Sequence, residues 1–180
     1  MSELGERLGL SSHVSPLGYK VAKLMKRYPL PGCESIEEWL MAVAFFRGFR
    51  IVRLPRQFNE RELIPSLDDL SNEELAVALC QSERRDEPQM LRLPAQMISR
   101  KVIDVRKLIL VARRERATRI LAELARQAVM VEPDHELWKK IHKQLDEEPA
   151  LPQPVVHWSR IAEPVMKNGR FNAEKWVLVS

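Results

Sequence analysis

The sequence has no run of about 18 consecutive apolar residues, which is the length a helix needs to cross a bilayer. Its longest apolar run, residues 39–46, is far shorter. The first ten residues also lack the charged and then apolar order of a secretory signal. These absences argue against a membrane span and against export, so we expect a cytoplasmic protein.

Cysteine is scarce, since Cys33 and Cys80 are the only two in 180 residues. They fall in different predicted elements, without a Cys, His or Asp partner at the spacing of metal ligands. A redox pair is one interpretation, but a small fold built on disulfides carries more cysteines for its size. We favour reduced, structural thiols, which agrees with a cytoplasmic location.

Glycine is also scarce, with six in the chain. There is no GxGxxG and no Walker-type loop, so we expect no backbone cradle for phosphate. Gly32-Cys33-Glu34 is the nearest approach to a nucleophile turn, and it lacks a second glycine and a local base. His135 and His142 are seven residues apart, whereas a zinc-protease helix requires a spacing of four. We therefore predict a protein that is not an enzyme, with no catalytic, cofactor or metal site.

The chain has the composition of one helical core, with 45% hydrophobic and 30% charged residues. Residues typical of helix starts recur along it. They are Ser15 before Pro16, Ser35 with Glu38, Ser71 with Glu74, Pro88, Asp104, and Pro133 before Asp134. These signals predict an all-α fold over residues 1–148, a compact helical bundle in which HEAT-like helix pairs are possible.

Several elements of this bundle permit two interpretations. Residues 49–58 are either an edge strand or extended chain. Pro94 either kinks its helix or forces it to begin later. Residues 104–131 carry two apolar stripes on different sides, so they form one helix buried on both sides or two antiparallel helices that break near 114–117. The run 39–46 is apolar all round and predicts a central, buried helix that Gly48 ends.

Residues 149–180 differ from the rest of the chain. They begin with the proline-rich stretch PALPQPVV, which predicts a stiff linker, and Asn168-Gly169 then signals a hairpin. We expect a short β-like C-terminal arm that either packs on its own body or adds a strand to another chain. Its candidate partner-binding residues are Trp158, Phe171, Trp176 and Leu178.

Basic residues gather in two places, within a net charge of +4. Lys20, Lys23, Lys26 and Arg27 lie opposite the apolar stripe of the first helix. The second group comprises Arg84, Arg85, Arg100, Lys101, Arg106, Lys107, Arg113, Arg114, Arg116, Arg119 and Arg126. Its candidate contact residues are Arg113, Arg114, Arg116 and Arg119. Both groups could contact phosphates or an acidic partner, because the guanidinium fork matches phosphate oxygens. The alternatives are ordinary solvated helix faces, a membrane surface for the first helix, and pairing of the second group with the acidic stretch 57–83.

Two functional classes remain. The first is a non-catalytic protein–protein interaction subunit of an intracellular complex, bacterial or phage in origin, which uses helical surfaces and the C-terminal arm. Its partner is another protein or a second copy. The alternative is a nucleic-acid-binding or regulatory protein, antitoxin-like, that contacts phosphates through its Lys- and Arg-rich helices.

Overall fold

A computed structural model describes residues 15–49, 67–81 and 88–151. These residues contain seven α-helices, one short 3-10 turn at Leu67–Asp69 and no strand, which confirms the all-α prediction for this part of the chain. The helices are α2 (Pro16–Arg27), α3 (Ile36–Phe46), α4 (Asn72–Gln81), α5 (Pro88–Ser99), α6 (Val105–Arg114), α7 (Thr118–Val131) and α8 (Glu136–Gln144). None of these helices is long and apolar enough to span a bilayer. The predicted strand beyond Phe49 and the C-terminal arm lie outside the described residues, and the boundary between 148 and 149 stays a prediction.

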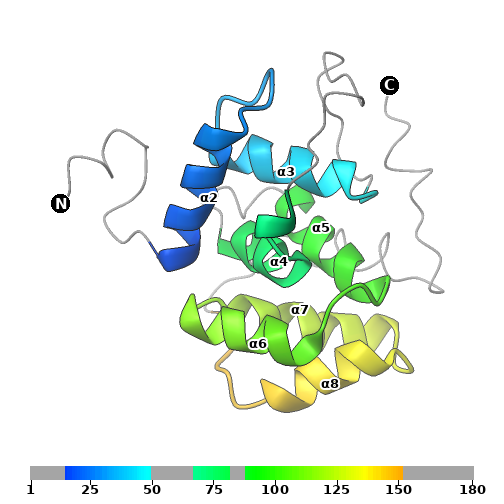
Figure 1. Ribbon diagram of the computed structural model, residues 1–180. Coiled ribbons are helices and arrows are strands. Elements are labelled where there is room, and N and C mark those ends of the chain that lie inside the picture. Colours follow the sequence, from blue (N-terminus) through cyan, green and yellow to red (C-terminus); the bar gives the residue numbers. More distant parts are fainter. Residues whose placement is uncertain (1–14, 50–66, 82–87, 152–180) are drawn as a thin grey trace.

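The helices surround α4, which packs against α2, α3, α5 and α6. In Figure 1, α6, α7 and α8 lie together below α4 and α5, α3 crosses above them, and α2 runs along one side. Residues 75–80 of α4 are buried without exception. Residues 39–44 of α3 are also buried, as predicted for an apolar run, but α4 occupies the centre.

The N-terminal caps predicted at Ser15, Ser35, Ser71 and Asp104 are present, because each depends on residues only two or three positions apart. Ser35 and Glu38 form a reciprocal capping box. In the box at α4, the Ser71 amide donates to Glu74 Oε2 at 3.0 Å and the Glu74 amide donates to Ser71 Oγ at 3.2 Å. Asp104 caps α6 through the amides of Arg106 and Lys107, and Ser15 caps α2 through that of Gly18.

Residues 104–131 form two helices, α6 and α7. At the end of α6 the Arg116 amide donates to the Arg113 carbonyl at 3.3 Å, and the Ala117 amide donates to the Ala112 carbonyl at 2.8 Å. This pair of bonds is a Schellman motif, in which the residue after the cap is left-handed. Arg116 holds that place with φ 57°. The helix therefore ends within the range 114–117 where one of the two interpretations places a break. Glycine usually fills the left-handed place, so the sequence did not decide between one helix and two.

The same motif ends α3 and α5. Gly48 takes the left-handed place after α3, with φ 87°, as the sequence predicts. After α5 the place belongs to Lys101, with φ 59°, whose amide donates to the Ile98 carbonyl at 3.0 Å. Two of these three helix ends therefore carry a cationic side chain where a glycine would be less strained.

Two further helix starts can be compared with the sequence. Helix α5 begins at Pro88 as predicted and continues through Pro94, which supplies no amide to the helix ladder. Helix α8 begins at Glu136 rather than at Pro133, because the cap is His135. The predicted apolar face of α8 is confirmed, since Trp138, Ile141 and Leu145 are all buried.

Candidate functional site

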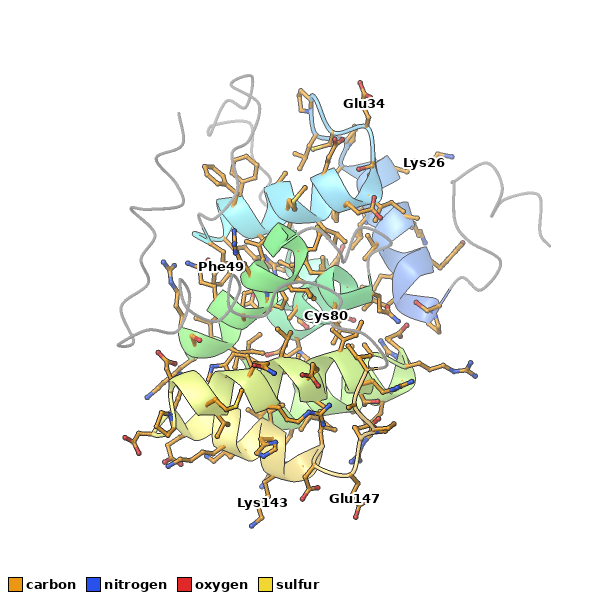
Figure 2. The ribbon with its side chains drawn as sticks, turned by 180° about the vertical axis from the view of Figure 1, so that it is seen from behind. Lys26, Glu34, Phe49, Cys80, Lys143 and Glu147 are labelled. Carbon is orange, nitrogen blue, oxygen red and sulfur yellow. The ribbon has the colours of Figure 1, made fainter. Side chains whose placement is uncertain are left out.

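The two thiols are free and lie within or against the apolar core. Cys80 is buried among residues of α4, α5, α6 and α7 that include Ile98, Leu108 and Leu121, and Figure 2 shows it in the interior. Burial raises the pKa of the Cys80 thiol to about 12. Burial and the charge of Glu38 raise the pKa of the Cys33 thiol to about 11. Both thiols are therefore protonated and weakly nucleophilic near neutral pH.

Among the residues that the structure describes, no group of three or more His, Cys, Asp or Glu side chains could hold a metal ion. His135 caps α8, and its Nε2 lies 3.0 Å from the Ser99 carbonyl oxygen. This histidine therefore ties α8 to the end of α5.

Helices α2 and α6 carry the most concentrated charge of one sign in the described part of the chain. Each has four Lys or Arg residues and no Asp or Glu between its first and last residue. We call these cations, together with Arg116, the basic surface. Its members are Lys20, Lys23, Lys26, Arg27, Arg106, Lys107, Arg113, Arg114 and Arg116.

The two halves of the basic surface meet where α2 begins and α6 ends. The backbone amide of Leu17 donates to Glu115 Oε2 at 3.2 Å, so the residue after α6 contacts the first turn of α2. Glu74 of α4 pairs with Lys20 of the first half, and the charge of Arg114 in the second half also lowers the pKa of Glu74. Structure therefore joins two cationic groups that lie about 90 residues apart in the sequence.

Four cations of the basic surface face acidic side chains. Lys20 Nζ lies 2.8 Å from Glu74 Oε2, and Lys107 Nζ lies 3.3 Å from Glu73 Oε2. Arg114 Nε donates to Glu115 Oε1 at 2.7 Å, and Arg27 lies 3.9 Å from Asp69. The predicted pairing of the acidic stretch with the second basic group is thus confirmed for Glu73 and Lys107. Glu74 and Asp69 instead pair with the first helix, which was not predicted.

The other five cations are exposed and have no ion-pair partner among the described residues. They are Lys23, Lys26, Arg106, Arg113 and Arg116. Figure 2 shows Lys26 at the outer edge of the molecule. Two exposed apolar side chains stand among them, Leu110 at 70% exposure and Tyr19 at 50%. This arrangement can attract an anionic partner and also offer it apolar contacts.

The sequence placed Arg106 in the second basic group but not among the candidate contact residues, and Leu110 was in neither set. The signal was present, because Leu110 stands four residues after Arg106 and three before Arg113, which places all three on one helix face. This face is hard to recognise from the sequence, because residues 104–131 carry two apolar stripes and the sequence does not decide whether they form one helix or two.

No known protein family, curated protein or solved structure matches this chain. A function must therefore be inferred from its own residues.

Arg119 differs from the other predicted site residues, because it holds the chain that follows α8. Its Nη2 donates to the Ala150 carbonyl at 2.9 Å, and Nη1 of Arg126 donates to the Glu148 carbonyl at 3.1 Å. The chain from 148 to 150 therefore runs antiparallel to α7, toward the turn that contains Arg116. Leu151 packs against the core beyond it. The predicted partner-binding residues Trp158, Phe171, Trp176 and Leu178 lie outside the described residues.

Proposed function

We propose that this protein is a non-catalytic binding subunit of an intracellular complex, a helical bundle that holds an acidic protein through the basic surface. The observation that carries the proposal is Leu110, which is exposed on α6 between Arg106 and Arg113, two exposed cations that are unpaired among the described residues. The C-terminal arm is a second proposed contact, through Trp158, Phe171, Trp176 and Leu178. Because residues 148–150 run toward the Arg116 turn, the arm leaves the described body close to the basic surface.

Charge and apolar exposure together favour a protein partner. Arginine and apolar anchors are typical of the centres of protein interfaces, where guanidinium groups pair with carboxylates. Four carboxylates, Asp69, Glu73, Glu74 and Glu115, already accompany the basic surface. They reduce its positive potential and would weaken binding to a continuous row of phosphates. A protein can instead place its own carboxylates opposite the five exposed cations alone.

The test is affinity purification from the native host with the full chain and two charge-reversed variants. One variant carries Arg106→Glu and Arg113→Glu. The matched control carries Lys140→Glu and Lys143→Glu on α8, where both side chains are exposed and outside the basic surface. We expect an acidic protein that the wild type and the control retain and that the first variant loses. Once purified, that acidic protein should bind the wild type and the control variant and should not bind the variant with Arg106→Glu and Arg113→Glu. Equal retention by both variants would contradict the proposal.

Nucleic-acid binding is the second candidate, because the exposed Arg113 and Arg116 have the geometry to contact phosphates. Fluorescence anisotropy with duplex DNA and with RNA tests it, at about 50 mM and about 200 mM salt. This candidate would be favoured if binding falls steeply between these concentrations and if the variant with Arg106→Glu and Arg113→Glu does not bind. If neither nucleic acid binds at the lower salt concentration, the candidate is removed.

A further inference from the structure

The exposed face of α6 has a regular pattern along the helix axis. Arg106, Leu110 and Arg113 are exposed, whereas the intervening Leu108, Ile109, Val111 and Ala112 are buried. Since an α-helix rises 1.5 Å per residue, the three exposed side chains start about 6 Å and then about 4.5 Å apart along the axis. The face is therefore a row of a cation, an apolar side chain and a second cation.

We infer that this face of α6 receives an acidic amphipathic helix of the partner, with an apolar side chain packed on Leu110 and carboxylates opposite Arg106 and Arg113. The inference rests on the proposed function and specifies its partner. A helix laid along α6 repeats its own side chains at three and four residues, so its acid, apolar and acid positions match the row. In an extended strand, side chains on the same face are about 6.6 Å apart. Over the two intervals, such a strand would be about 3 Å out of register with the row on α6.

Charge also decides between a second copy and a different protein. A two-fold contact centred on α6 would place the α6 row of one copy against that of the other. Arg106 and Arg113 would then face cations, because α6 contains no acidic residue. Like charges brought together at an interface oppose association. Charge therefore opposes pairing of α6 with α6, and the occupant that we infer is a different polypeptide, acidic on the face that also carries its apolar anchor.

The probe for this site is a synthetic helical peptide of about 14 residues, built from Ala, Glu and one Leu. It carries Glu, Leu and Glu at positions i, i+4 and i+7. A second peptide has Ser in place of that Leu and the same charge. The full chain is titrated with each peptide by fluorescence anisotropy. Leu110→Ser is compared with Met130→Ser on α7, which is a matched control because Met130 is also 70% exposed.

We expect the Leu peptide to bind the wild type and Met130→Ser equally and to bind Leu110→Ser about tenfold more weakly. The Ser peptide should bind the wild type, Met130→Ser and Leu110→Ser equally weakly, because no apolar contact is left to lose. The double variant Arg106→Glu with Arg113→Glu should bind both peptides more weakly than the wild type does.

The experiments can contradict the acidic partner and its inferred helix separately. If the charge reversal abolishes binding while Leu110→Ser has no effect, the acidic partner stands and the helix with an apolar anchor is wrong. The same conclusion follows if Met130→Ser weakens binding as much as Leu110→Ser. If the Leu peptide does not bind the wild type, the inferred helix is also wrong. If the native partner is retained by the charge-reversed variant, the proposed function fails as well.

Discussion

The buried carboxylate of Glu115 accepts a hydrogen bond from the backbone amide of Leu17, 98 residues earlier in the chain. Leu17 lies in the first turn of α2, where amides have no partner within the helix and where the helix dipole favours a negative charge. The other oxygen of Glu115 accepts from Arg114 Nε. The Gln81 side chain donates to the Glu115 carbonyl. Glu115 thus joins α2, α4 and α6 at the place where α2 begins and α6 ends.

Replacing Glu115 tests this junction. Glu115→Ala leaves the Leu17 amide buried without its acceptor, so we expect the free energy of unfolding to fall by about 2 kcal/mol. Glu115→Gln keeps an oxygen acceptor and loses only the charge, so the loss should be about half as large. Urea denaturation at constant m-value provides the measurement. Equal effects of the two substitutions would show that the hydrogen bond to Leu17 contributes little.

Acid should destabilise the protein through Glu74. Burial opposes ionisation of Glu74, but hydrogen bonds from Lys20 and Ser71 together outweigh it and lower the pKa below the usual 4.5. A lowered folded-state pKa stabilises the fold above about pH 4.5, and the contribution is lost as the pH falls through the folded pKa. Because Lys20 is partly exposed, we expect this contribution to be no more than about 1 kcal/mol.

The measurement for Glu74 is urea denaturation of the wild type and Glu74→Gln at pH values from about 7 to about 3. The variant should be less stable near pH 7 and should approach the wild type at the acid end. Lys20→Met removes the paired cation and should reduce the same acid sensitivity. A constant difference between wild type and Glu74→Gln at every pH would contradict the assignment.

Arg116 should be replaceable by glycine with a gain in stability. Its φ of 57° is left-handed, a conformation that costs an L residue about 1 kcal/mol and costs glycine little. We expect Arg116→Gly to raise the free energy of unfolding by about 0.5 to 1 kcal/mol. Arg116→Ala removes the charge but keeps the strain, so it should bring no gain. Lys101→Gly should stabilise by a similar amount, because φ of Lys101 is 59°.

The glycine substitution also separates stability from binding. If Arg116 contacts the acidic partner, Arg116→Gly should bind it more weakly although it is more stable, whereas Lys101→Gly should bind it normally. Unchanged binding by Arg116→Gly would remove Arg116 from the proposed interface.

Replacing the buried amide of Gln96 should stabilise the protein. The Gln96 side chain on α5 is fully buried, and neither amide atom has a hydrogen-bond partner among the residues that the structure describes. Burying an amide without a partner is costly, so Gln96→Met, which has a similar volume, should stabilise the protein by about 1 kcal/mol or more. Gln81→Met is the contrast, because Gln81 donates to the Glu115 carbonyl and its loss should destabilise. Thermal melts followed by circular dichroism distinguish the two directions.

How much of the fold could be predicted depends on the range of the interaction concerned. Ser71 and Glu74 predict their helix start because both partners of the cap lie within one turn. Whether residues 104–131 form one helix or two could not be decided, because the usual signal for a helix end is a glycine and Arg116 stands there. The centre of the fold was assigned to α3 from its apolar composition, while packing placed α4 there, since burial depends on which elements surround a helix.

The candidate site divides in the same way. Residue types and helical spacing alone determined that α2 and α6 carry cationic faces, because a helix aligns residues three and four apart. Only the tertiary structure decided that these faces meet at Glu115 and Leu17, that Glu73 and Glu74 neutralise Lys107 and Lys20, and that Arg106, Arg113 and Leu110 are left exposed. The reason is physical: charge pairing depends on distances of a few ångströms between side chains, and those distances are set by packing between helices far apart in the chain.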